Sequence, residues 1–184
     1  MKGFVRTTVL GLALLVSGLA AAADKLFVRD DLASDAIRLE SRLKTKAEGT
    51  ADLAVLKRSA EAAFQKADWA AITTLYGRIA PLEPKDPLNW QRFAIGAAMQ
   101  DVADYSARWQ LRNDAHAAAY LAYQRATTPP VEAAALTALA LTYVRTDDQR
   151  VALGALRASL KTFETADARA QYDKLRPQYG FRVL

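Results

Sequence analysis

The fold is indicated most clearly by the stretch Ala67-Asp68-Trp69-Ala70-Ala71-Ile72-Thr73-Thr74-Leu75-Tyr76-Gly77-Arg78-Ile79, which is followed by Leu82-Glu83-Pro84 and Trp90. Its large apolar residues recur at spacings of three and four, as they do on one face of an α-helix. Asp68 is a typical helix cap, and Pro84 cannot continue a helix. Trp90 then opens a second apolar pattern of the same kind. The stretch therefore predicts two consecutive helices joined by a short turn.

Apolar residues follow the same spacing through most of the remaining chain. Gly and Pro are scarce, and no glycine-rich phosphate loop lies between a strand and a helix. We therefore predict an all-α fold built of antiparallel helix hairpins. The predicted helices cover 30 or 31 to 46, 50 or 52 to 66, 68–79, 88–100, 113 or 114 to 126, 131–145, 149–163 and 166–176.

The segment between Met99 and Asn113 is ambiguous. It contains no Gly or Pro, so the helix that begins at residue 88 can extend into it. In that case Val102, Tyr105 and Trp109 are expected to be buried. Independently of this extension, Trp69, Trp90 and Trp109 are expected to be core residues. The alternative is a loop.

The first 23 residues have the order of a secretory signal peptide. Lys2 and Arg6 form a basic start, an uncharged apolar run follows, and Ala21 and Ala23 provide a small-residue cleavage site before residue 24. A retained N-terminal anchor is the alternative, although the run is shorter than the ~20 residues a membrane span requires. We expect a periplasmic or secreted product, residues 24–184, without a membrane anchor. Loss of two basic residues lowers the net charge from +5 to +3.

Several classes of chemistry are disfavoured by the composition. The 184 residues include no Cys and one His, so disulfides, thiolate chemistry and Cys/His zinc sites are excluded. No Ser lies in a nucleophile elbow, His116 is expected to be a packed or surface residue, and Asp147-Asp148 is expected to form a capping turn. Basic residues are scattered among acidic ones, which argues against a nucleic-acid partner. We expect no enzyme activity and no cofactor.

A repeated pattern is visible along the helices. Its first part is Leu56-x2-Ser59-Ala60-x2-Ala63, Trp90-x2-Phe93-Ala94-x2-Ala97 and Leu136-x2-Leu139-Ala140-x2-Tyr143, and its second part is Ile72-x3-Tyr76, Ala119-x3-Tyr123 and Ala152-x3-Leu156. The first two copies begin 34 residues apart and the next begins 46 residues later. This pattern resembles the tetratricopeptide repeat (TPR) family, whose period is ~34 residues. The alternative is an alanine-rich bundle with accidental spacing.

The TPR resemblance implies a short solenoid of about three repeats. The repeats would cover 53–165. A linker and a capping helix would precede them in 24–52, and a second capping helix would follow in 166–178. Members of this family bind proteins or peptides on the concave face. The residues expected on that face are Lys57, Arg58, Glu61, Arg92, Ile95, Met99, Leu141 and Arg145. The set is mixed and partly apolar, which suits a protein surface better than a free peptide C-terminus.

The end of the chain alternates apolar and polar residues. Residues 179–184 are therefore predicted to begin a strand of a following domain, or else to form a short tail. Residues 24–31, the alanine-rich repeats and residues 176–184 together resemble the N-terminal helical region of bacterial alpha-2-macroglobulin family proteins. That resemblance implies the non-catalytic N-terminal part of a protease-inhibitor or defence protein, whose own β-domains could be partners. The alternative is a stand-alone periplasmic TPR adaptor that binds peptide or envelope-assembly partners.

Overall fold

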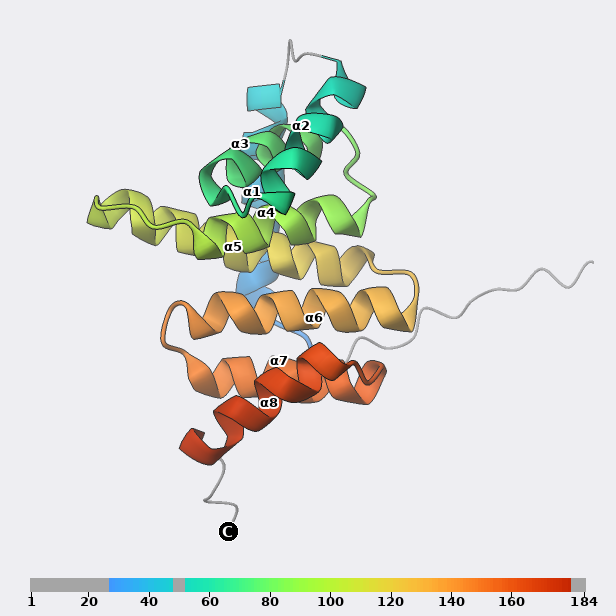
Figure 1. Cartoon of the computed structure of the whole chain (residues 1–184), viewed down its shortest axis with the longest axis vertical. Helices are drawn as coiled ribbons and strands as arrows, with labels where there is room; N and C mark the ends of the chain where they lie inside the picture. The colour runs from blue at the N-terminus through green and yellow to red at the C-terminus, as the bar shows by residue number, and fades with distance from the viewer. Residues whose placement is uncertain (1–26, 48–51, 180–184) are drawn as a thin grey trace, which may run out of the picture.

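The computed structural model describes residues 27–47 and 52–179 of the chain, and within them the fold is all-α. Eight helices are formed in these ranges (Figure 1). Their bounds are α1 Asp30–Ala47, α2 Leu53–Gln65, α3 Trp69–Ile79, α4 Pro87–Met99, α5 Tyr105–Arg125, α6 Pro129–Val144, α7 Gln149–Thr162 and α8 Ala166–Tyr179. The predicted fold class is confirmed at this level.

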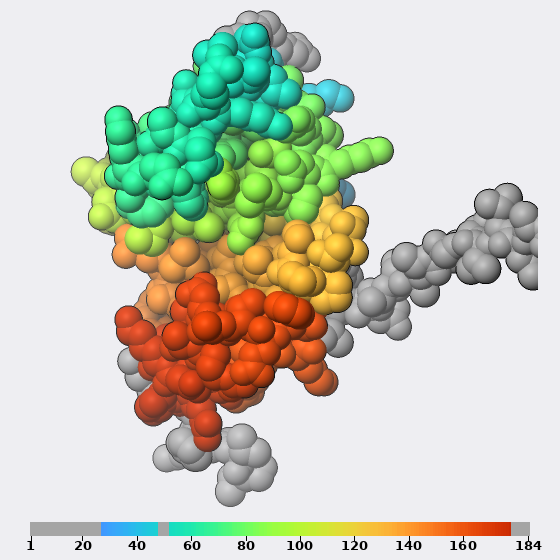
Figure 2. All heavy atoms as spheres, turned by 45° about the vertical axis from the view of Figure 1, so that its right-hand side comes forward, coloured from blue at the N-terminus to red at the C-terminus, as the bar shows by residue number. Residues whose placement is uncertain are grey.

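Consecutive helices from α2 onward pack against each other in antiparallel hairpins. Helices α4 to α7 run side by side across the long axis of the molecule (Figure 1). Helix α8 packs on α7 and α6, and in the space-filling view it covers much of the last hairpin (Figure 2). Helix α1 runs behind the others along the long axis. It contacts α5 and α3 but, among the described residues, not α2.

Aspartates begin most of the helices. The side chains of Asp52, Asp68, Asp86, Asp104 and Asp148 each accept a hydrogen bond from a backbone N–H of the first turn of the helix that follows. These N–H groups lack partners within the helix, so an N-cap satisfies one of them. The predicted capping role of Asp148 is confirmed.

Helix α1 is attached through one apolar stripe and through the segment that precedes it. Leu32, Ala36, Leu39, Leu43 and Ala47 are its buried residues, and their spacing of three and four places them on one face. Ahead of the helix, the backbone N–H of Phe27 donates to the Tyr123 hydroxyl at 2.9 Å, and that of Arg29 donates to the Tyr120 hydroxyl at 3.3 Å. Both tyrosines belong to α5, so this helix anchors the start of the described chain.

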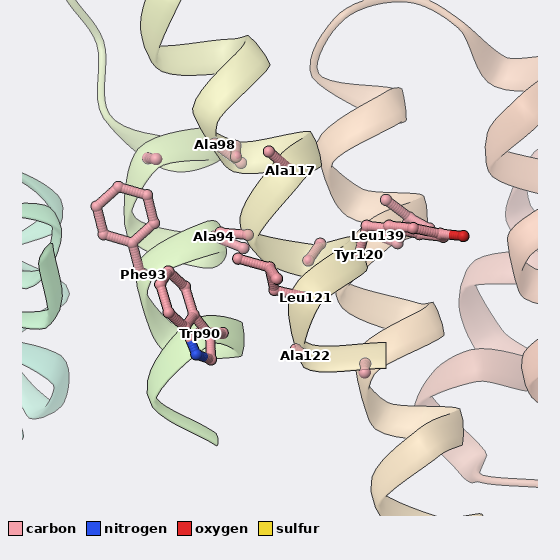
Figure 3. Packing of buried hydrophobic residues seen from close by; sticks show 14 of the residues in the cluster. Trp90, Phe93, Ala94, Ala98, Ala117, Tyr120, Leu121, Ala122 and Leu139 are labelled. Carbon is pink, nitrogen blue, oxygen red and sulfur yellow. The ribbon is translucent and has the colours of Figure 1, made fainter. Parts of the chain in front are cut away.

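The most extensive contact between two helices is that of α4 with α5. Trp90 is fully buried, and its indole Nε1 donates to the Pro84 carbonyl at 2.9 Å. On the same helix Ala94 and Ala98 lie toward Ala117 of α5 and its neighbours (Figure 3). Small side chains at this crossing let the two helices approach closely. Six small and large residues of the repeated pattern are buried, namely Ala60, Ala94, Ala140, Tyr76, Tyr123 and Leu156.

The structure corrects the prediction for the segment after Met99. Helix α4 ends there, and α5 begins at Tyr105, eight residues before the predicted start. The extension therefore belongs to α5, because Asp104 caps a new helix. Val102 is half-buried, whereas Tyr105 and Trp109 are 72% and 58% exposed, so the prediction that this segment is buried was wrong.

The C-terminal boundary also differs from the prediction. Helix α8 continues through Pro177 to Tyr179. Pro177 removes one backbone hydrogen bond of the helix. The helix ends two residues later, so no further turn has to bend around the proline ring. Tyr179 is therefore helical and does not begin a strand. The remaining residues of the predicted strand, and the predicted signal peptide 1–23, lie outside the described residues.

Candidate functional site

Four of the residues predicted for the concave face are engaged in ion pairs, and three of them, Lys57, Glu61 and Arg92, lie on α2 and α4. The ammonium of Lys57 lies 2.6 Å from a carboxylate oxygen of Glu83. Arg92 pairs with Glu61, donates to the Tyr76 hydroxyl at 2.6 Å and stacks over the Phe64 ring. Arg92 holds the pKa of the exposed Glu61 carboxyl below its usual range. These side chains connect α2, α3 and α4, and we assign them to the packing of the first helices.

The other predicted residues do not form one surface. Arg58 is exposed on α2, and Met99 is half-buried at the end of α4. Ile95 and Leu141 line a groove of about 250 Å³ between α4, α6 and the start of α8. Arg145 lies elsewhere, after the end of α6. The predicted set is therefore divided among several places.

The pocket that contains Arg145 is larger, at about 660 Å³, and we call it the arginine pocket. Three segments form it: the loop between α4 and α5, the first half of α5, and the turn between α6 and α7. The first turns of α5 project beyond the neighbouring helices on the left of Figure 1. The residues of the arginine pocket are Asp101, Tyr105, Arg108, Trp109, Arg112, Asn113, His116, Arg145, Thr146 and Asp147.

Arg112 is the most buried charged residue of the arginine pocket, with 10% of its side chain exposed. It donates to the Ala97 carbonyl over a long 3.5 Å, and its guanidinium lies 3.9 Å from the Asp101 carboxylate. Arg145 binds more closely, to the Ala98 carbonyl at 3.2 Å and to Asp101 at 3.0 Å. Burial, with repulsion from Arg145, lowers the pKa of Arg112.

His116 forms part of the wall of the arginine pocket. Its ring stacks on Tyr143 with ring centres 4.3 Å apart, and its Nε2 lies 3.3 Å from the Thr146 hydroxyl. Burial lowers its pKa below the usual value for histidine, so the ring is neutral near pH 7. Two nearby arginines, Arg29 and Arg112, act in the same direction. This packed position agrees with the expectation for His116.

Trp109 separates the arginine pocket from a second pocket of about 580 Å³ between α1 and α5. In that second pocket Arg42 of α1 pairs with Asp114 of α5 at 2.5 Å. Trp109 and Tyr105 both lie on the projecting turns of α5. An exposed tryptophan beside arginines is typical of a surface that contacts another protein.

The sequence does contain a signal for the arginine pocket. Tyr105 and Trp109 are four residues apart, as are Arg108 and Arg112, so each pair lies on one side of a helix. This pattern predicts two faces of one helix once Asp104 is recognised as the N-cap of α5. The contribution of Arg145 could not be found in this way, because it lies 33 residues after Arg112 in the chain.

The comparisons with known proteins identify no relative. No protein-family model matches the chain, and neither a curated protein nor a solved structure matches it. Across residues 27–47 and 52–179, no helix has the length and apolar character needed to cross a membrane. In the same residues no group of three or more His, Asp or Glu side chains could hold a metal ion.

Proposed function

We propose that the chain is an exported, TPR-like helical-repeat module that binds another protein and carries no catalytic activity of its own. The observation that carries this proposal is the exposure of Tyr105 and Trp109 beside the charged arginine pocket. Exposed aromatic and arginine side chains are enriched at protein interfaces, where a few such residues provide most of the binding energy.

The repeat assignment is supported by two turns of the same construction. In the α2–α3 turn Ala67 has a positive φ of 52°, and Asp68 caps the next helix. In the α6–α7 turn Asp147 has a φ of 62°, and Asp148 is the cap. The backbone N–H of each capping aspartate donates over 3.0 Å to a carbonyl five residues earlier. Ala67 and Asp147 lie 80 residues apart in the sequence. This equals the separation of Leu56 and Leu136 in the repeated pattern.

The middle hairpin, α4 with α5, fits the same scheme with an insertion. Trp90 follows Leu56 by 34 residues, and α4 contacts α6, as the first helices of adjacent repeats do in a stack. The first helix of the preceding repeat, α2, is joined to α4 by the Glu61–Arg92 ion pair and not by close backbone packing. Its extra length lies in the loop 100–104 and in the first turns of α5. These are the segments that build the arginine pocket. The proposed binding surface therefore coincides with the part of the repeat that departs from the period.

Two settings are compatible with this function. The order of the predicted export signal, the helical hairpins and a C-terminal segment of alternating apolar and polar residues supports the N-terminal part of an alpha-2-macroglobulin-like protein. The same signal and the open pocket also support a stand-alone periplasmic adaptor. Reading the coding sequence beyond Leu184 separates them: several hundred codons of β-rich sequence favour the first setting, and a stop codon favours the second.

The binding function can be tested by photocrosslinking in the native host. A benzoylphenylalanine replaces Trp109 in one variant and Phe163 in the control. Phe163 is also an exposed aromatic, but it follows α7 at the end of the α6–α7 hairpin away from the arginine pocket. The proposal predicts a discrete crosslinked protein from position 109 and none from position 163. Equal crosslinking at both positions, or none at either, contradicts it.

A further inference from the structure

The arginine pocket is lined by more positively charged side chains than negatively charged ones. Arg108, Arg112 and Arg145 line it together with two carboxylates, Asp101 and Asp147. Asp101 is 89% exposed, and it serves both Arg112 and Arg145. An exposed carboxylate is largely solvated and contributes little to an ion pair.

Arg112 has the strongest need for a further anion. A guanidinium has five N–H donors, and within the described residues Arg112 has two polar contacts, at 3.5 Å and 3.9 Å. Arg145 and Arg108 both repel it. Burying a charge without close partners is costly, and an entering anion with good hydrogen-bonding geometry would recover part of that cost.

The structure also provides an apolar contact next to this charge. Trp109 lines the arginine pocket, and Tyr105 lies one helical turn before it under the Arg108 guanidinium, which is 5.8 Å from the ring centre. A ligand held by the arginines would therefore present its neighbouring group to an exposed aromatic surface. This combination fits a chain with alternating charged and apolar side chains.

We infer that the arginine pocket binds an acidic segment of the partner protein, with side-chain carboxylates on Arg112, Arg145 and Arg108 and an apolar side chain on Trp109. This inference rests on the proposed function and specifies its partner. The arginines lie on α5 and on the α6–α7 turn, so several carboxylates can bind, whereas a single C-terminal carboxylate would engage part of the set. Asp101 and Asp147 interrupt the basic lining of the pocket, whereas a nucleic acid is bound by a continuous basic patch or stripe.

The test measures binding of capped synthetic peptides to the purified full chain by isothermal titration calorimetry. One peptide alternates glutamate with leucine, and its counterpart has glutamine in place of glutamate. The glutamate peptide is expected to bind at least about tenfold more tightly, as charge-assisted hydrogen bonds imply. A glutamine peptide with a free C-terminal carboxylate and a single-stranded oligonucleotide complete the set, and both are expected to bind more weakly than the glutamate peptide.

The variants are Arg112→Gln, Arg145→Gln and Trp109→Ala, each expected to weaken the glutamate peptide about tenfold or more. Arg169→Gln on the exposed part of α8 is the control and is expected to leave binding unchanged. Because Trp109 and Arg145 are not deeply buried, their variants remain informative if Arg112→Gln does not fold.

Equal binding of the glutamate and glutamine peptides, no binding of either, or tighter binding of the free-carboxylate peptide or the oligonucleotide overturns the inference. If the peptide test fails but position 109 still crosslinks a protein in cells, the proposed function stands and only the inference of an acidic partner segment is rejected. If crosslinking fails as well, both are rejected.

Discussion

Replacing Gly96 of α4 with alanine tests the close approach of α3 and α4. A Cβ at this position would lie 2.7 Å from Ile72 Cγ2, 3.0 Å from Thr73 Oγ1 and 3.1 Å from the Thr73 backbone nitrogen. Carbon atoms normally pack at about 3.5–4.0 Å. Ile72 is fully buried and its χ1 rotamer is restricted, so its methyl group cannot rotate away. The Thr73 backbone nitrogen can move only if helix α3 itself moves. Helices α3 and α4 would therefore have to separate.

The net effect follows from two opposing contributions. Overpacking of this kind costs about 1–3 kcal/mol, and three short contacts place Gly96→Ala in the upper half of that range. Alanine also recovers about 0.5–1 kcal/mol of helix propensity. We therefore expect a net loss of about 1–2 kcal/mol. For a domain of this size that corresponds to a fall in Tm of about 3–6 °C.

Gly154 of α7 provides the matched control, because a Cβ there would meet no atom within 4 Å. Gly154→Ala should retain the propensity gain alone and raise Tm by about 1–3 °C. Thermal unfolding followed by far-ultraviolet circular dichroism measures both variants. A rise in Tm for Gly96→Ala comparable to that for Gly154→Ala would refute the close approach of α3 and α4.

Three further predictions concern a turn, the core and pH. Ala67→Gly should stabilise the protein by about 0.5–1 kcal/mol, since glycine adopts the positive φ without steric cost; a lower denaturation midpoint would contradict this geometry. Trp90→Phe should cost about 1–3 kcal/mol in urea unfolding, because it opens space in the core and leaves the Pro84 carbonyl unpaired; a neutral effect would argue against a buried Trp90. Stability should fall as the pH drops below about 6.5, where the unfolded chain protonates His116 and the folded protein, with its lowered pKa, does not. His116→Gln should reduce this loss of stability. A pH profile that the substitution leaves unchanged would contradict the lowered pKa of His116 in the folded protein.

The helices were largely predictable because their signals are local. The apolar spacing and the aspartates at 52, 68 and 148 placed most boundaries within one or two residues of those observed. Asp104 is the instructive exception. Without it the segment after Met99 looked like an overrun of the preceding helix, and Trp109 was assigned to the core. One unrecognised cap thus changed the predicted environment of the aromatic residue on which the proposed function depends.

The binding surface was less predictable because it depends on partners distant in the chain. Arg92 was assigned to a free surface, but Glu61 lies next to it on α2 and pairs with it. Arg145 was expected on the concave face with the other seven residues, yet its neighbours Asp101 and Arg112 come from the α4–α5 loop and α5. The apolar stripe of α1 predicted which residues are buried but not that α3 and α5 bury them. Such pairings follow from helix packing, which local patterns do not specify.

The central claim is that the arginine pocket is the protein-binding surface, and amide hydrogen exchange of the purified protein tests it most directly. Exchange is measured with and without the protein that crosslinks to position 109. We predict added protection in 101–116 and 145–147, which carry the arginine pocket, and none around Phe163. Protection confined to other helices, or no difference between the two states, would contradict the claim.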